Sequence, residues 1–182
     1  MSQLTDDCFA FGGKLIPVAD ALARFREILA PVVEPETVSL ADALGRVLAA
    51  DATAGRSVPP HDNSAVDGYA VCFADLNTDT DTRLPVTARI AAGHPLGRVA
   101  EQGEAVQIFT GAPVPEGMDT VFMQEDVALD GDFVILPTGI KPGANRRKQG
   151  EDVVAGDVVI KTGSVLRAQE IGLAASVGRG KV

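Results

Sequence analysis

The chain has 182 residues, and 46% of them are hydrophobic, which suits one domain of ordinary size or two small ones with a buried core. The formal net charge of −9 argues against a nucleic-acid partner, because surfaces that bind nucleic acids are usually basic. The sequence has no apolar run long enough to cross a bilayer and no evident signal peptide at its start, so we expect a cytoplasmic protein with no membrane contact.

The first segment predicts a helix. In "PVADALARFREILAP" the apolar residues recur at helical spacing: Val18, Leu22, Phe25 and Leu29. Pro17 stands near the expected start, and Pro31 is expected to end the helix. After it, "ETVSL" alternates like a short strand, and "SLADALG" predicts one or two helical turns with Ser39 as cap and Gly45 as terminator. The next stretch, "RVLAADATA", has an extended pattern.

Between about Val58 and Gly143 the pattern changes to short apolar runs separated by clusters of Gly, Pro, Asp and Asn. Runs such as "GYAVCF", "LPVTARIAA", "AVQIFTG" and "DFVILP" are typical of the strands of an all-β unit. The clearest turn signal is Asp130-Gly131 in "VALDGDFVIL", which predicts a tight hairpin between two strands.

The last segment predicts a strand followed by a helix. "VVIKTGSVL" has the strand pattern, and "RAQEIGLAASVG" predicts a helix that ends near Gly178. The final residues, "RGKV", are expected to enter a further strand. We interpret this abrupt end as that of a fragment of a longer protein.

The stretch "SVPPHDNSAVDGYAV" concentrates residues that shape turns, directly before a strand. Asp62, Asn63 and Ser64 can bond nearby backbone N–H groups, and Gly68 can adopt a positive φ. On composition alone, a purely structural turn is the favoured interpretation. A calcium loop is excluded, because Phe73 stands where that motif requires a bidentate Glu.

A functional interpretation needs other polar loops that could converge on this stretch, and the sequence has two. "FTGAPVPEG" follows a predicted strand and offers the hydroxyl of Thr110 on a backbone stiffened by proline. "NRRKQGED" offers three cations followed by two carboxylates: Arg146, Arg147, Lys148, Glu151 and Asp152. The cations could form a solvated basic turn, or they could bind a phosphate or a similar oxyanion. The carboxylates could position a metal-bound water or orient a basic partner.

Other familiar chemistry is absent from the sequence. It contains neither a P-loop nor a GxGxxG placed after a strand. The two histidines, His61 and His94, are too few for a histidine metal cluster, and each is expected at a surface or turn. The two cysteines, Cys8 and Cys72, give neither a metal spacing nor a disulfide framework. We therefore predict no metal ligands in this chain.

Taken together, "PPHDNSAVDGYAV", "FTGAPVPEGMDTVFMQED" and "NRRKQGEDV" resemble the signatures of the molybdopterin molybdenumtransferase family, which shares this region with the carboxy-terminal domain of gephyrin. The resemblance runs from about Pro17 to the end. It implies an α+β, mostly β fold, in which a bent and coiled β domain is inserted into an elongated linker domain. On this chain, residues 1–51 and 146–182 would form the two halves of the linker domain, and residues 52–145 the inserted domain. Family members continue into an α/β domain that binds the pterin.

The resemblance also implies a reaction and a site. These enzymes use adenylylated molybdopterin and molybdate, with Mg²⁺ as helper, and release AMP and molybdenum cofactor. Motif positions assign a catalytic role to Asp67, Thr110 and Asp152. Substrate-binding roles are expected for five further residues: Asn63, Ser64, Gly111, Arg146 and Arg147. Val66 stands where many relatives have Met, an apolar exchange that a site can tolerate.

Two functions remain open. The chain is either the amino-terminal part of the transferase, inactive without the pterin-binding domain, or a non-catalytic module of the same fold for dimerisation or scaffolding. Family members are dimers, so a homodimer is expected, with a molybdopterin-type small molecule as substrate and other cofactor-biosynthesis proteins as possible partners. The retained Asp67 and Thr110 favour the enzyme, because a scaffold does not need them.

Overall fold

The computed structural model describes residues 16–182, so Cys8 lies outside the described residues. The chain divides into two units, residues 1–36 and residues 37–182, and each is described by itself. Among the described residues, no helix is both long and apolar enough to cross a membrane.

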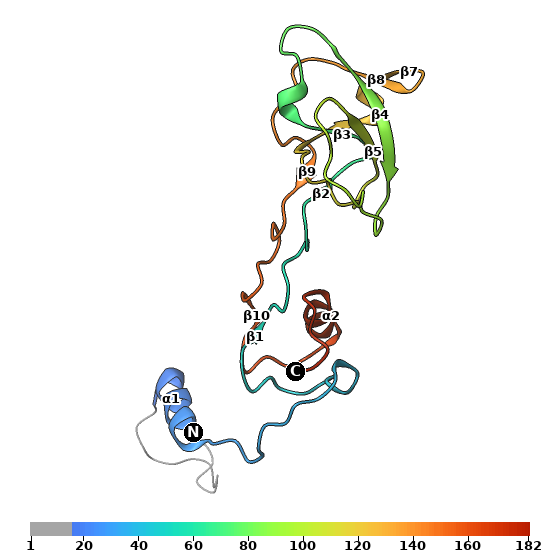
Figure 1. The fold of residues 1–182 in the computed structure, drawn as a ribbon. Coiled ribbons are helices and arrows are strands. Elements are labelled where there is room, and N and C mark those ends of the chain that lie inside the picture. Colours follow the sequence, from blue (N-terminus) through green and yellow to red (C-terminus); the bar gives the residue numbers. More distant parts are fainter. Residues whose placement is uncertain (1–15) are drawn as a thin grey trace, which may run out of the picture. The chain divides into compact units, whose positions relative to one another are not determined.

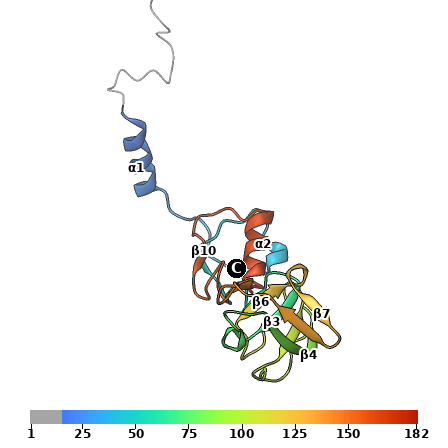
Figure 2. The ribbon, with the colours of Figure 1, turned by 90° about the horizontal axis from the view of Figure 1, so that it is seen from above.

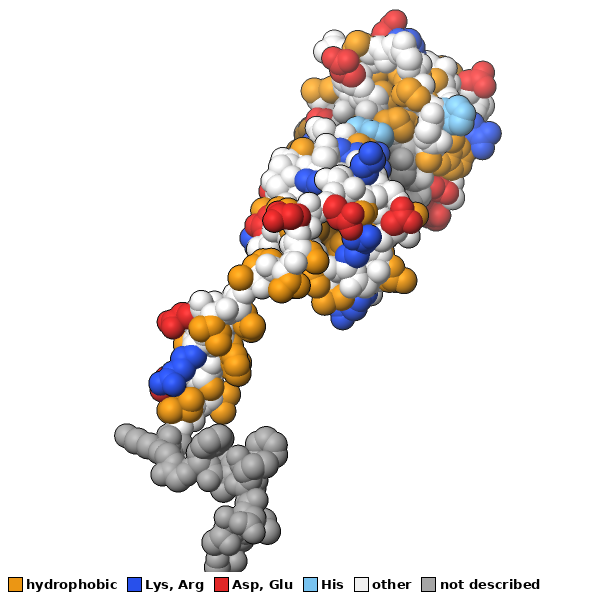
Figure 3. All heavy atoms as spheres, turned by 90° about the horizontal axis from the view of Figure 1, so that it is seen from below, with side chains coloured by type: hydrophobic (Ala, Val, Ile, Leu, Met, Phe, Trp, Pro, Cys, Tyr) orange, Lys and Arg blue, Asp and Glu red, His pale blue; other side chains and the backbone are white. Residues whose placement is uncertain are grey.

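In the first unit, α1 spans Val18–Ile28, which confirms the predicted helix. Pro17 is its N-cap, and the helix ends at Leu29, whose backbone is extended. Pro31 explains this ending, because a proline disfavours helical backbone at the residue before it. No residue of α1 is buried, and Figure 3 shows its hydrophobic side chains along one side of the helix. Val18 is 75% exposed and Phe25 is 54% exposed.

The second unit contains a six-stranded sheet in the order β6-β3-β5-β4-β8-β7 (Figures 1 and 2). Its strands are β3 (Gly68–Val71), β4 (Thr82–Ile90), β5 (Ala105–Ile108), β6 (Thr120–Met123), β7 (Ala128–Asp130) and β8 (Phe133–Leu136). All neighbours pair antiparallel except β4 and β5, which are parallel. The register of β4 against β5 shifts between Val86 and Ala88, and such irregularities bend a sheet.

Two hydrophobic clusters cover the two faces of this sheet. Tyr69 and Val71 pack into one cluster with Phe122 and Leu136. Ala70, between them in sequence, belongs to the other cluster. Because side chains alternate across a strand, β3 is buried on both faces, and all four of its residues are buried. The single tyrosine of the chain is therefore a core residue.

Two short antiparallel ladders pair the segments on either side of this sheet (Figure 1). One joins β1 (Ala52–Thr53) to β10 (Val158–Ile160), and the other joins β2 (Asn63–Ser64) to β9 (Arg146–Arg147). A bridge between Val58 and Val153 lies between the two ladders.

A third hydrophobic cluster is built from residues on both sides of the sheet sequence: Ala43, Leu48, Ala52, Ile160, Leu166 and Ala174. It is covered by the 3₁₀ turn η1 (Leu40–Asp42) and by α2 (Ala168–Ser176), the predicted second helix. The end of the chain pairs with its early part, since Val38 and Val182 exchange backbone hydrogen bonds of 2.8 and 3.0 Å. The expected extension of "RGKV" is therefore found, as a bridge of Lys181 with Ser39.

The structure confirms a mostly β fold and the helical turn predicted in "SLADALG", which is η1 with Ser39 as its N-cap. It corrects three local predictions. The stretch "ETVSL" forms one isolated bridge, at Ser39, rather than a strand. "VVIKTGSVL" is a strand only as far as Ile160, because a turn follows. In the predicted hairpin, Asp130 pairs with Phe133, so the two-residue loop is Gly131-Asp132, one residue later than expected. Gly131 has a φ of 62°, which explains why glycine stands there.

Candidate functional site

The three polar loops singled out in the sequence meet around β2. Asn63 lies opposite Arg147 and Ser64 opposite Arg146 in the ladder with β9. On the other side of Ser64, its backbone N–H donates to the carbonyl of Ala112 at 3.0 Å. Its carbonyl accepts from the N–H of Gly111 at 2.9 Å. Backbone hydrogen bonds from one short strand thus hold the other two loops in place, as a shared site requires.

Asp67 and Thr110 form the most specific polar contact of this region. One carboxylate oxygen of Asp67, Oδ1, accepts both from the backbone N–H of Thr110 at 2.8 Å and from its hydroxyl at 2.7 Å. The backbone hydrogen bond first, and then the hydroxyl, hold the pKa of the Asp67 carboxyl below its usual value. Within the described part of the chain, Oδ2 of Asp67 has no hydrogen-bond partner. Thr110 is exposed and Asp67 is partly exposed, so a fixed carboxylate with a free oxygen lies near the surface.

Gly68 positions Asp67, but not for the reason expected from the sequence. Glycine permits a positive φ, but Gly68 is not among the glycines that adopt one. The backbone of β6 approaches so closely that a Cβ on Gly68 would overlap the carbonyl oxygen of Phe122. Next to this close approach, the N–H of Gln124, directly after β6, donates to the carbonyl of Asp67 at 3.0 Å. Glycine is therefore required for the close approach that fixes Asp67.

Ser64 and Asn63 lie inside the loop rather than at its surface. Ser64 is 2% exposed, and its hydroxyl donates to the carbonyl of Val66 at 2.5 Å. Asn63 is partly buried, and its amide nitrogen, in the orientation that satisfies both side-chain atoms, donates to the carbonyl of His61 at 2.8 Å. Their role in substrate binding stays a prediction. Their observed contacts shape the backbone that leads to Asp67.

The two arginines of β9 have different environments. The side chain of Arg147 contacts Glu151 at 3.3 Å and Asp152 at 2.6 Å, and these carboxylates raise the pKa of Arg147. Arg146 has a weaker ion pair with Asp62, at 3.4 Å, and its Nε is buried without a hydrogen-bond partner. An unpaired buried donor is costly, so Arg146 is the better candidate of the two for binding an anion.

Asp152 does not join the Asp67–Thr110 pair. Its carboxylate binds Arg147, and its backbone N–H donates to the carbonyl of Val58 at 2.9 Å. No hydrogen bond links Asp152 to Asp67 or Thr110 within residues 16–182. The structure thus brings together Asp67, Thr110 and Gly111 with the β2 residues, and it reaches Asp152 only through Arg147.

Two residues that the sequence reasoning did not single out also shape the site. Asn145 has a φ of 56°, and its side-chain amide donates to the carbonyl of Val121 at 2.9 Å. The N–H of Gln149 donates to Oδ1 of Asp62 at 2.7 Å. The Gly-Ala-Asn sequence before the arginines was an available signal for a left-handed turn at Asn145, since asparagine tolerates that conformation better than most residues.

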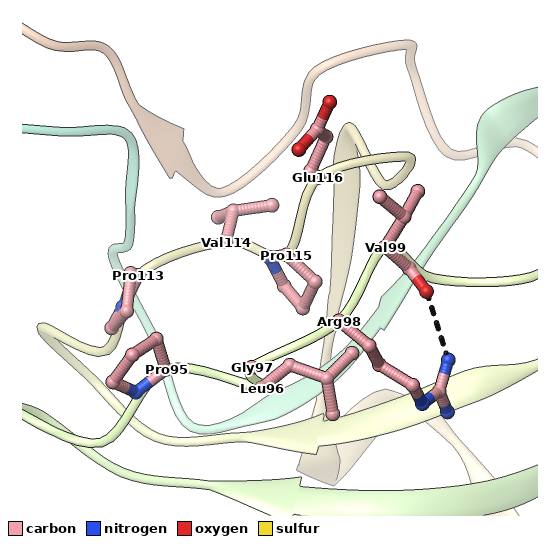
Figure 4. A pocket seen from close by; sticks show the side chains of 9 residues that line it. All are labelled: Pro95, Leu96, Gly97, Arg98, Val99, Pro113, Val114, Pro115 and Glu116. Carbon is pink, nitrogen blue, oxygen red and sulfur yellow. Dashed lines mark hydrogen bonds between the residues drawn. The ribbon is translucent and has the colours of Figure 1, made fainter.

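A shallow cavity of about 380 Å³ lies beyond Thr110 on the same loop. Figure 4 shows its lining, in which residues 95–99 face residues 113–116. The N–H of Ala100 donates to the carbonyl of Glu116 at 2.8 Å and ties these two segments together. Arg98 is neutralised by Glu104, at 2.7 Å, so the cavity offers mainly apolar surface.

Neither this cavity nor the loops around β2 provide a full set of metal ligands among the described residues. The described residues contain no group of three or more His, Cys, Asp or Glu side chains that could together hold a metal ion. A hard cation such as Mg²⁺ keeps several waters and commonly uses one or two carboxylates together with substrate phosphates. The free Oδ2 of Asp67 fits such a single contribution.

Comparison with solved structures places this mostly β fold in a known class. It superposes on the molybdopterin biosynthesis moeA protein from Pyrococcus horikoshii OT3 with a TM-score of 0.79 and 34% sequence identity. The match covers 93% of this chain and 45% of that one.

Residues 16–178 match the family described as MoeA N-terminal region (domain I and II), and the chain belongs to that family. It is 38% identical over 169 residues to a molybdopterin molybdenumtransferase from Haemophilus influenzae, covering 92% of this chain and 41% of the relative. It is 40% identical over 149 residues to molybdopterin molybdenumtransferase 2 from Mycobacterium tuberculosis, covering 79% of this chain and 36% of the relative. The chain therefore spans about two fifths of the length of these relatives.

Proposed function

We propose that this chain is the amino-terminal part of a transferase that inserts molybdenum from molybdate into adenylylated molybdopterin and releases AMP and molybdenum cofactor. The proposal is supported by the names of its relatives and by a fixed carboxylate that could orient a cation for a phosphate-containing substrate. It includes the domain organisation, in which residues 52–145 form a domain inserted between residues 1–51 and 146–182.

The observation that carries the proposal is the partly exposed Asp67 carboxylate held by both donors of Thr110. Two donors on one oxygen favour the ionised form and fix its direction, while the second oxygen stays available. A carboxylate that only capped a turn would need neither the free oxygen nor its position at the surface. Asp67 is thus suited to orient a hydrated cation or a basic group on the substrate side.

For the proposed helper ion, Mg²⁺, this arrangement offers one carboxylate oxygen. Mg²⁺ would use Oδ2 of Asp67 as one ligand, and it would supply charge neutralisation for the substrate's phosphates. Arg146 would add a guanidinium charge from the adjacent strand, where its ion pair with Asp62 is long, at 3.4 Å. Asp152 would act indirectly in this scheme, because it holds Arg147.

The alternative is a non-catalytic module for dimerisation or scaffolding. The exposed apolar side of α1 favours this function, since such surfaces commonly mark interfaces. The two functions make opposite predictions for Asp67, because an interface formed by α1 does not use that carboxylate.

The proposal is tested in a chimera in which this chain replaces the matching part of the Haemophilus influenzae relative. We expect the chimera to form molybdenum cofactor from adenylylated molybdopterin and molybdate. The chain alone should not. Asp67→Asn should lower the rate by about two orders of magnitude, the scale for loss of a positioned charged group. Its melting temperature should change little, because Asn can still accept from Thr110.

Asp51→Asn is the matched control. Asp51 also accepts a backbone N–H, that of Thr162 at 2.8 Å, and its pKa is also lowered, but it lies outside the proposed site. We expect this variant to keep the rate of the unsubstituted chimera. If the chimera is active and Asp67→Asn does not change its rate, Asp67 is not a functional residue. The non-catalytic alternative would then be favoured for this chain.

A further inference from the structure

A second cavity, of about 540 Å³, lies next to the Thr110 loop, and none of the site residues named above lines it. It is lined by Arg89, Ile90, Ala91, His94 and Phe109. Its volume lies within the range of roughly 300–1,000 Å³ typical of small-molecule sites.

The topology of the sheet explains why these residues meet. β4 and β5 are parallel and in register at Ile90 and Ile108, so both strands end at the same edge. The N–H of Phe109 donates to the carbonyl of Ile90 at 3.2 Å, which joins the two segments that follow. A Cβ on Gly111 would lie 3.9 Å from that of Ala92, so the turn at residues 91–94 contacts the Thr110 loop. The cavity and Asp67 therefore both contact the loop that contains Thr110.

The charge of this cavity is positive in a chain of net charge −9, and no carboxylate lines it. The guanidinium of Arg89 stacks over the ring of Phe109, 4.7 Å from its centroid. Arg89 has no ion pair within the described residues. Stacking on one face orders the guanidinium and leaves its edge donors and its other face accessible.

The same strand provides a comparison. Arg83, also on β4, stacks over Phe133 at 3.4 Å, but its guanidinium binds the carboxylate of Asp130 at 2.9 Å. The Arg83–Phe133 pair is thus complete without a ligand. Arg89–Phe109 has the same aromatic partner type and lacks the anion.

His94 adds a second polar group. Its Nδ1 lies 3.2 Å from the carbonyl oxygen of Ala92, and since a carbonyl only accepts, Nδ1 carries the proton in this contact. Nε2 has no hydrogen-bond partner in the part of the chain that the structure describes. It is available for a ligand in the cavity.

We propose that this cavity binds a phosphate ester that carries a planar heterocycle. The edge donors of Arg89 bind the phosphate oxygens, and the heterocycle stacks on the open face of the guanidinium. Nε2 of His94 accepts a hydrogen bond from an N–H group of the heterocycle. The adenylyl and the pterin parts of the substrate proposed above share this chemistry, so the identity of the ligand rests on the proposed function.

The test uses the ¹⁵N-labelled chain of residues 1–182 and three probes: AMP, adenosine and a phosphorylated pterin. We expect AMP or the phosphorylated pterin, at about 1 mM, to shift the amide signals of residues 89–94 and 109–111. Adenosine, which lacks the phosphate, should shift them much less. Arg89→Gln should weaken binding about tenfold, as expected for loss of a charge-assisted hydrogen bond, and His94→Gln should weaken it less. Arg83→Gln is the matched control and should bind like the unsubstituted chain.

The probes also distinguish the two sources of the phosphate. Shifts with AMP alone assign the adenylyl part to the cavity, and shifts with the phosphorylated pterin alone assign the pterin part. Either result supports the proposal. Absence of shifts with both probes, equal shifts with adenosine, or equal weakening by Arg83→Gln would overturn it. The amide shifts report binding to this chain, and the chimera reports cofactor formation, so a failure of the proposed function and a failure of this site are separately visible.

Discussion

At Gly68 the site depends on the absence of a Cβ atom. Gly68 sits where the backbones of β3 and β6 approach most closely, and a Cβ there would overlap the carbonyl oxygen of Phe122. We expect Gly68→Ala to lower the free energy of unfolding by about 1–3 kcal/mol, as overpacking in a core does. Urea denaturation measures the loss. Gly172→Ala is the control, because Gly172 lies in α2 with open space around it, and alanine favours helix. Equal stabilities of the two variants would contradict this account.

At the same scale, Glu104 provides a pH-dependent contribution to stability. It is 5% exposed and accepts from Arg98 at 2.7 and 2.8 Å, from the N–H of Glu101 at 2.8 Å, and from the hydroxyl of Thr87. Arg98 is the main cause that lowers the pKa of Glu104 to about 2. A carboxyl with a lowered pKa stabilises the folded state above the pKa of the unfolded chain. That stability is lost as the pH falls from about 4.5 towards 2.

Glu104→Gln tests this contribution. We expect the free energy of unfolding to fall by about 1–2 kcal/mol at pH 7. This is less than the lowered pKa alone would give, because the Arg98 side chain is 41% exposed and solvent partly screens its charge. The difference between the two proteins should shrink as the pH is lowered to 3. Thermal unfolding across this pH range measures it, and the comparison cancels other titrating carboxylates such as Glu170. A difference that stays constant with pH would show that the ion pair does not contribute.

Among the elements, β9 is held to the sheet through the residue that precedes it. Asn145 adopts a φ of 56°, donates to the carbonyl of Val121, and accepts from the N–H of Ala65 with its own carbonyl. Asn145→Gly removes the side-chain hydrogen bond and should cost about 1 kcal/mol. Asn145→Ala should cost about 2 kcal/mol, because alanine also opposes the left-handed backbone. Denaturation of both variants separates the two effects. Equal stability of Asn145→Ala and Asn145→Gly would show that the left-handed backbone at this position does not disfavour alanine.

For the molecule as a whole, we predict self-association through α1. Its apolar residues are exposed, with Leu22 at 49% and Phe25 at 54%, and such a surface is expected at an interface. Sedimentation at tens of micromolar, roughly where a modest interface persists, should show a dimer. Phe25→Glu should give a monomer. Leu129→Glu is the control on the edge strand β7, where the leucine is 63% exposed, and it should not change the mass. A monomeric unsubstituted chain would refute the prediction.

The local pattern of the sequence determined the elements whose signal lies within a few residues. Helix α1 follows from apolar spacing and flanking prolines, and the hairpin at Gly131 from its turn residues. The mostly β character followed in the same way. The polar motifs at Asp67 and Thr110 were also visible, because together with "NRRKQGEDV" they resemble the signatures of one family, and the family match agrees with that resemblance.

Only the tertiary structure decided which residues meet. Thr110 reaches Asp67 from 43 positions away, and Arg89 meets Phe109 because two parallel strands end together. It also decided that Gly68 serves a close approach rather than a positive φ, and that Asp152 binds Arg147 instead of joining Asp67. These outcomes depend on the order and register of the strands. Both are set by packing across the whole sheet, in which β3 is buried on both faces. Local residue patterns carry no such information, because the same alternation of side chains suits many different pairings.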